Sequence, residues 1–238
     1  MAHIVSAYDE ELAALDNELA RMGGLAEQQL AQAIDAMSRA DHELAEEVIR
    51  ADKEMDRLER EVEERAVLLI ARRQPMARDL REVVVAIKTS SDLERIGDLA
   101  KNIAKRVKVL SGDRPIKIIG GLGRMARLVL EQLKNVLDAH ARRDADKALE
   151  VWLSDEQIDA MYNSLFRELL TYMMEDPRNI GICTHLLFAA KNMERMGDHA
   201  TNIAENVYFL VHGVSLADER PKLDVTTAIP LDPGKDDR

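Results

Sequence analysis

The sequence predicts an all-α protein built as two tandem, pseudo-symmetric three-helix bundles with six long helices. Three observations support this fold class. The composition is 46% hydrophobic but only 3% aromatic, whereas pleated sheets prefer aromatic and β-branched residues. Apolar residues recur at three- and four-residue spacing through long stretches, which is the period of an amphipathic helix. A unit of about a hundred residues then repeats along the chain.

The first three helices follow from the apolar spacing. Apolar residues continue at this spacing through residues 12–37 and again through residues 44–69. A third series begins after Pro75, and a proline just ahead of a helix is favourable because its missing N–H would have no partner there. Residues 111–123 then combine glycines with a proline, which predicts a linker.

The same organisation starts again after this linker. Pro177 precedes the last helix as Pro75 precedes the third. Three helices are expected in this half, at about residues 124–140, 144–174 and 178–212. The residues that follow mix proline, glycine and charge without a period, which is typical of a flexible tail. We therefore expect a first repeat at residues 1–110, a second repeat at 111–212 and a tail at 213–238.

One motif carries the clearest part of the repeat. The chain reads "ERIGDLAKNIA" from Glu94 and "ERMGDHATNIA" from Glu194. Each copy has a glycine, Gly97 or Gly197, on the apolar face of its helix, although a glycine inside a helix costs about 1 kcal/mol relative to alanine. We expect both glycines to permit close packing of a neighbouring helix.

Acidic residues follow the apolar face in each repeat. Glu94 and Asp98 are four residues apart, on one side of their helix, and the second copy repeats the pair. Like charges at this spacing repel, so we expect a cation beside each pair. Oxygen ligands suit a hard metal ion such as Mg²⁺, Mn²⁺ or Fe³⁺. The alternatives are ion pairs with Arg95 and Arg195, or a solvated face. The candidate metal ligands are Asp52, Asp56, Glu94, Asp98 and Asn102 in the first repeat, and Asp155, Asp159, Glu194, Asp198 and Asn202 in the second.

The remaining composition excludes several classes of protein. A formal net charge of −11 argues against nonspecific binding of nucleic acid and against adhesion to anionic membranes. Cys183 is the only cysteine, so no internal disulfide is possible, and this fits a reducing compartment. Neither a signal peptide nor an apolar run long enough to cross a bilayer is visible. We therefore expect a cytoplasmic protein that meets the membrane only through protein partners.

An enzyme is the main alternative class. A di-metal carboxylate oxidase would also use acids from bundle helices, but it normally needs Glu-x-x-His motifs, and none occurs here. The P-loop, HExxH and dinucleotide-binding motifs are absent as well. We expect no catalytic residues, and a metal-binding helical protein with di-metal enzymatic activity is the alternative.

A basic segment, "ARRQPMARDLR" at residues 71–81, stands out from the acidic background. One interpretation is a helix junction whose arginines pair with nearby acids. The other is a docking site for an acidic partner, where such charges would mainly set association rate and specificity. The candidate partner-binding residues are Arg72, Arg73, Arg78 and Arg81.

Several long motifs, in order, resemble the PhoU family, the accessory and signalling proteins of bacterial phosphate transport. The resemblance covers nearly the whole chain to about residue 213. It implies a fold of two tandem three-helix bundles, in agreement with the helical periodicity. The stretches that carry it are "YDEEL" near the start, "MGGLAEQQL" (22–30), "ARRQPMARDLR" (71–81) and "YMMEDPRNIGICTHLLFAAKNMERMGDHATNIAENVYFLV" (172–211).

The resemblance also implies a function. It implies a negative regulator of the phosphate-starvation response that links the ATPase subunit of a phosphate ABC transporter to a membrane histidine kinase that senses phosphate. We expect a homodimer or a higher homo-oligomer. Multinuclear iron or zinc clusters on the acidic motifs are implied for some family members, and manganese or magnesium would also suit these ligands. Leu99 stands where the second repeat has His199, so the two sites need not be equivalent.

Overall fold

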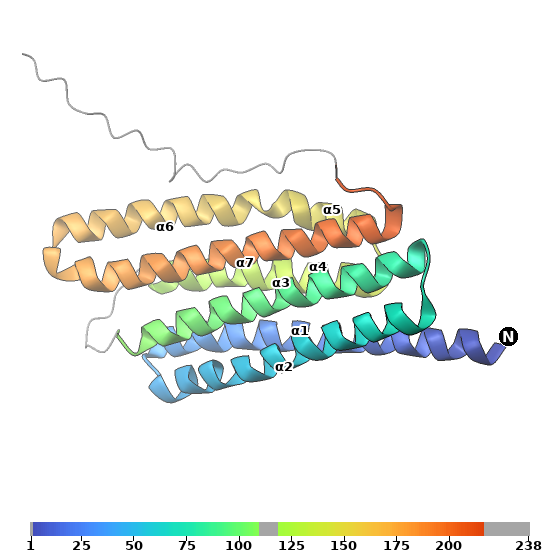
Figure 1. Ribbon diagram of the computed structural model, residues 1–238. Helices are drawn as coiled ribbons and strands as arrows, with labels where there is room; N and C mark the ends of the chain where they lie inside the picture. Colours follow the sequence, from blue (N-terminus) through green and yellow to red (C-terminus); the bar gives the residue numbers. More distant parts are fainter. Residues whose placement is uncertain (1, 110–118, 217–238) are drawn as a thin grey trace, which may run out of the picture.

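The computed structural model describes residues 2–109 and 119–216, and within them it contains two three-helix bundles (Figure 1). The first bundle consists of α1 (Ala2–Arg39), α2 (His42–Arg73) and α3 (Arg78–Val107). The second consists of α4 (Ile119–Arg142), α5 (Ala145–Ser154), α6 (Glu156–Glu175) and α7 (Ile180–His212), with the short 3₁₀ helix η1 (Pro177–Asn179) before α7. The predicted fold class is confirmed.

The second bundle differs from the prediction in one helix. The fifth helix, expected as one piece over residues 144–174, is divided into α5 and α6 at Asp155. Just before the break, the Ser154 hydroxyl donates to the carbonyl of Val151 at 2.8 Å. The Ser90 hydroxyl in α3 and the Thr201 hydroxyl in α7 make the same bond inside uninterrupted helices, so this bond does not by itself explain the division.

Two predicted boundaries also need comment. α4 begins at Ile119, so the end of the predicted linker, 111–123, is helical, and residues 111–118 of that linker lie outside the described residues. The predicted tail starts at Gly213, which ends α7 in the left-handed conformation with φ 73°. A helix commonly ends at such a residue because glycine has no Cβ to oppose it. From residue 217 onward the tail lies outside the described residues.

Equivalent caps begin the second helix of each repeat. The Asp41 side chain accepts hydrogen bonds from the backbone N–H groups of Glu43 and Leu44 at the start of α2. The Asp144 side chain accepts from the N–H of Lys147 at the start of α5. Aspartate at this position satisfies N–H groups that have no partner within the helix. The internal repeat is therefore visible in the hydrogen bonding as well as in the sequence.

The two bundles pack side by side through α3 and α7, which lie at the centre of the molecule and run in opposite directions (Figure 1). α1 and α4 also contact each other, and Arg143, just after α4, pairs with Asp16 of α1 at 2.8 Å. One continuous hydrophobic core extends through both bundles. As a consequence, the α2–α3 turn and the α6–α7 turn lie at opposite ends of the molecule (Figure 1). None of the helices in the described part of the chain combines the length and apolar character needed to span a membrane.

Candidate functional site

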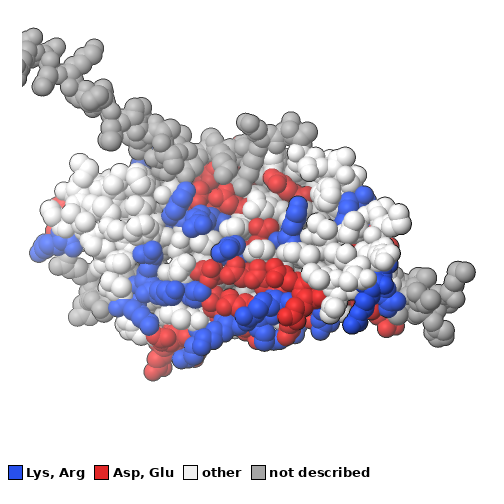
Figure 2. Space-filling model, viewed as in Figure 1, with Lys and Arg blue, Asp and Glu red and all other residues white. Residues whose placement is uncertain are grey.

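Carboxylates gather along one side of α2 and α3, and we call this group the first acidic strip. It consists of Asp52, Asp56 and Glu59 of α2 and Glu94 and Asp98 of α3. Figure 2 shows acidic side chains concentrated in the middle of this face. The two helices meet at this strip, because one side chain, Lys101, contacts Asp52 and Asp98 together.

The cation at this meeting point is a lysine that the sequence analysis did not identify. Lys101 Nζ lies 2.5 Å from Asp52 Oδ2 and 2.5 Å from Asp98 Oδ1. Arg95, the arginine expected to neutralise the acids, is 59% exposed and reaches Glu94 and Asp98 only at 3.5 and 3.9 Å. A signal was available, since Lys101 follows Asp98 by three residues and therefore lies beside it on α3.

The first acidic strip has more carboxylates than cations. Burial, followed by the negative charges of Asp98 and Glu59, raises the pKa of Glu94 to about 7. Burial also raises the pKa of Asp52 and of Glu59, although Lys101 opposes the effect at Asp52. Glu94 therefore changes charge near neutral pH, which an isolated surface glutamate would not do.

The second acidic strip comprises Glu194 and Asp198 of α7 with Asp159 of α6 and Asp155 at the α5–α6 break. Here too the nearest cation is a lysine, because Lys191 Nζ donates to Glu194 Oε1 at 2.9 Å. Burial raises the pKa of Glu194, which is only 5% exposed. Arg195, the arginine that the sequence offered as a partner for these acids, is exposed.

The two strips use lysines from different places. Lys101 corresponds to Thr201 in the second repeat, and Lys191 corresponds to Ser91 in the first. The carboxylates are thus repeated, while the neutralising lysine is not. The two strips are similar in their acids and distinct in their charge balance.

The motif glycines pack against buried glutamines of the first helix in each bundle. A Cβ on Gly97 would lie 2.9 Å from Gln29 Oε1 and 3.2 Å from Met55 Cγ. A Cβ on Gly197 would lie 3.3 Å from Gln132 Oε1 and 3.1 Å from Asp155 Oδ1. The expected close packing at both glycines is confirmed, and Gln132 also donates to Asp155 Oδ1 at 3.3 Å.

The two candidate asparagines behave differently. Asn102 Oδ1 accepts a hydrogen bond from Lys105 Nζ at 3.5 Å on its own helix. Asn202 Nδ2 donates instead to Asp92 Oδ1 of α3 at 3.2 Å, across the boundary between the bundles. Asp92 was not identified from the sequence, and it also lies 3.0 Å from His199 Nδ1. The change from Leu99 to His199 between the repeats was the available signal.

The candidate metal ligands do not converge as placed. Among the residues that the structure describes, no group of three or more histidine, cysteine or carboxylate side chains could hold a metal ion. Lysine ammonium groups lie beside the closest carboxylates instead. Metal binding at the acidic strips stays a prediction.

The four candidate arginines lie near the α2–α3 turn in unlike environments. Arg73 pairs with Glu11 of α1 at 3.0 Å, and Arg78 pairs with Glu82 at 3.4 Å. Arg72 is exposed and lines a groove of about 360 Å³ between α1 and α2. Arg81 lies against Gly213 at the end of α7. Arg73 and Arg78 pair with acids, as expected for a helix junction held by ion pairs. Arg72 and Arg78 are exposed, as expected for a docking site.

These features define a class of protein: a tandem pair of three-helix bundles, each with a strip of acidic side chains beside a lysine. The family model "PhoU domain" matches the chain twice, at residues 19–107 and 122–207. The chain belongs to the PhoU family. The resemblance stated from the sequence motifs is thereby confirmed.

Individual relatives agree with this assignment. The chain is 54% identical over 229 residues to a "phosphate-specific transport system accessory protein PhoU homolog" of Rhizobium meliloti (strain 1021), covering 96% of this chain and 97% of that protein. It is 39% identical over 211 residues to the "phosphate-specific transport system accessory protein PhoU" of Escherichia coli (strain K12), covering 89% and 88%. The crystal structure of PhoU from Pseudomonas aeruginosa matches with a TM-score of 0.83 and 41% identity, covering 87% of this chain and 100% of that one.

Proposed function

We propose that this chain is an accessory protein of phosphate transport and a negative regulator of the phosphate-starvation response, which acts as a cytoplasmic adaptor and modulates phosphate uptake. It would link the ATPase subunit of a phosphate ABC transporter to a membrane histidine kinase that senses phosphate. The observation that carries the proposal is 54% identity, over 96% of the chain, to a protein named as accessory to the phosphate-specific transport system. A crystal structure named as a phosphate transport system regulatory protein, from Streptococcus pneumoniae, matches with a TM-score of 0.82 and 31% identity, covering 88% of this chain and 99% of that one. The proposal includes no catalytic role.

The two ends of the molecule support a role that joins two proteins. At the α2–α3 turn, Met76 is 80% exposed beside the exposed arginines Arg72 and Arg78. At the α6–α7 turn, Met174 is 84% exposed and Ile180 is 49% exposed. Large apolar side chains at such exposure, with charges around them, are typical of protein contact sites. The proposed assembly is a homodimer or higher homo-oligomer, and each subunit would present both ends.

Charge reversal at the α2–α3 turn tests the adaptor role. We expect Arg72→Glu/Arg78→Glu to weaken binding of the transporter ATPase subunit or of the kinase at least tenfold, because rim charges set association rate and specificity. The measurement is the affinity of each purified partner for the immobilised protein, at low and at moderate salt. Arg50→Glu/Arg60→Glu, which changes two exposed arginines within α2, is the matched control for added negative charge. Unchanged binding of both partners to Arg72→Glu/Arg78→Glu would remove this turn from the proposal.

The acidic strips are proposed to bind iron, zinc, manganese or magnesium. Their donors fit a hard cation in type, since all are carboxylate oxygens. Asp56, Glu59 and Glu94 would be the ligands that Lys101 does not contact in the first strip, and a metal ion between Asp52 and Asp98 would replace the ammonium group of Lys101. A bound cation would supply the positive charge that the strip lacks.

Elemental analysis of untagged protein tests metal binding. Wild type is expected to hold metal in stoichiometric amount, and Glu94→Gln/Asp98→Asn and Glu194→Gln/Asp198→Asn are each expected to lose part of it. Glu43→Gln/Glu47→Gln changes an exposed pair of glutamates with the same spacing on α2 and should change nothing. A correctly folded wild type without metal after growth and purification in metal-supplemented media would overturn this part of the proposal and leave the strips as lysine-paired surfaces.

A further inference from the structure

The contact between α3 and α7 has two unequal ends, although the two helices are repeats of each other. At one end, Asp92 of α3 lies 3.0 Å from His199 Nδ1 and accepts hydrogen bonds from Asn202 at 3.2 Å and Asn206 at 3.5 Å. One carboxylate thus serves three side chains of α7. The equivalent end can be located by adding or subtracting one hundred residues.

At the other end of the contact, the equivalent positions hold side chains of different charge. Asn192 stands where Asp92 does, and Arg106 stands where Asn206 does. The carboxylate is therefore missing from this end, while a guanidinium has been added. The repeat predicts a carboxylate at a place where the chain supplies an amide and an imidazole but no negative charge.

Arg106 is partly buried and has no counter-ion. Its Nη1 lies 3.4 Å from His185 Nδ1, and its guanidinium lies over the ring of Phe188 at 4.5 Å. Its Nε is buried without a hydrogen-bond partner. Within residues 2–109 and 119–216, no carboxylate forms an ion pair with this group, and burial lowers the pKa of Arg106. A partly desolvated cation without a counter-ion is unfavourable, which distinguishes Arg106 from the arginines elsewhere on the molecule that pair with carboxylates.

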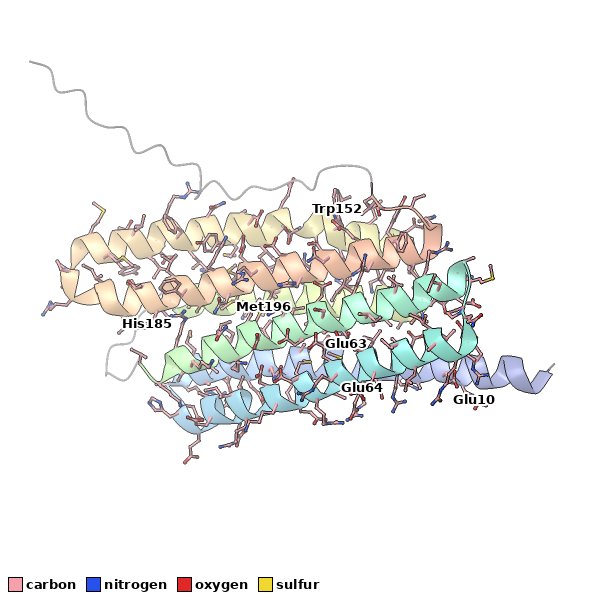
Figure 3. The ribbon with its side chains drawn as sticks, viewed as in Figure 1. Glu10, Glu63, Glu64, Trp152, His185 and Met196 are labelled. Atoms are coloured by element: carbon pink, nitrogen blue, oxygen red, sulfur yellow. The ribbon has the colours of Figure 1, made fainter. Side chains whose placement is uncertain are left out.

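Asn192 provides a second unsatisfied donor on the same face of α7. His185, Phe188 and Asn192 are three and four residues apart, which places them one above the other along the helix. The Nδ2 of Asn192 is buried and has no hydrogen-bond partner. Figure 3 labels His185 where α7 passes the end of α3, so this face of α7 meets the last turns of α3. Two orphaned donors and one imidazole therefore belong to the same end of the contact.

We propose that this end of the α3–α7 contact binds a phosphate-type oxyanion between Arg106, Asn192 and His185. Such an anion would supply the missing acceptor, since the planar guanidinium suits the oxygens of phosphate. Because the ligands come from both bundles, the bound anion would stabilise the packing of one bundle against the other. Free inorganic phosphate and the phosphoryl groups of a nucleotide offer the same chemistry. The inference does not depend on the adaptor role, because it concerns the isolated protein.

Equilibrium dialysis of labelled inorganic phosphate against metal-stripped full-length protein tests the proposal. We expect saturable binding of one phosphate per chain and a melting temperature that rises with phosphate concentration. Arg106→Gln should weaken binding at least tenfold. Asn192→Asp should abolish it, because this variant restores the carboxylate of the other end and gives Arg106 an internal partner. Its melting temperature should rise without phosphate and no longer respond to it. Arg95→Gln, which changes an exposed arginine beside the first acidic strip, is the control and should bind as wild type does.

Two results would overturn the proposal. One is the absence of saturable binding to wild type by either inorganic phosphate or ATP. The other is binding that persists unchanged in Asn192→Asp and Arg106→Gln. A parallel series with ATP distinguishes the sources of the anion: tighter binding of inorganic phosphate assigns the site to the free ion, and tighter binding of ATP assigns it to a nucleotide.

Discussion

Glu94 is an acidic residue whose proton affinity depends strongly on the tertiary structure. The pKa of its carboxyl group is raised above the usual value of a glutamate, to about 7, because the group is buried beside Asp98 and Glu59. The position of Glu94 on the acidic face was predicted from the sequence. The excess of negative charge around it was not, because it depends on Glu59 of another helix and on Lys101 being engaged by Asp52 and Asp98.

This pKa predicts how stability depends on pH. The folded state holds the Glu94 proton more tightly than the unfolded chain, so Glu94 lowers the stability of wild type progressively as pH rises from about 4.5 to about 7. Above that range its full effect is present. Glu94→Gln should therefore match wild type near pH 4 and exceed it at pH 8 by on the order of 1–2 kcal/mol in the free energy of unfolding.

Urea unfolding at several pH values, with a chelator present, measures this difference. Glu168→Gln, an exposed glutamate of α6, is the control and should show no such pH dependence. A stability difference between Glu94→Gln and wild type that stays constant from pH 4 to pH 8 would contradict the raised pKa.

At the scale of the helices, the motif glycine determines how closely α1, α2 and α3 approach. The sequence alone indicated that Gly97 lies on a packing face. It could not identify the neighbour, because the partner is Gln29, which is far away in the chain and fully buried. The equivalent Gln132 lies over Gly197, so the same packing is used in both bundles.

Two glycine substitutions separate packing from helix propensity. Gly97→Ala should lower the free energy of unfolding by about 1–3 kcal/mol, because a Cβ there would press on Gln29 and Met55. Gly24→Ala is the matched control, since a Cβ at Gly24 would meet nothing within 4 Å. It should raise the free energy of unfolding by up to about 1 kcal/mol, which is the helix propensity gain alone. Denaturant unfolding measures both variants, and a stabilised Gly97→Ala protein would show that the glycine has no packing role.

At the scale of the whole molecule, the two bundles are repeats of each other, but the contact between them is not symmetric. The repeats have nearly the same helices and the same acids, yet α3 and α7 carry Asp92 at one end of their contact and Arg106 at the other. The two exposed turns are likewise equivalent in the repeat but unlike in charge, with Arg72 and Arg78 at one end. An asymmetric molecule can present different surfaces to different partners, which a strict repeat could not.

The amino-acid sequence by itself determined the fold class, the tandem repeat, the limits of most helices and the two rows of acids. These features depend on local periodicity and on duplication, both of which can be recognised along the chain without knowing how the helices pack. The tertiary structure alone decided that lysines rather than arginines lie closest to the acids, that Asn202 joins Asp92, and that the Nε of Arg106 is buried without a hydrogen-bond partner among the described residues. Each of these pairs or omissions depends on residues from different helices, whose mutual positions are set by how the helices pack and not by spacing along the chain.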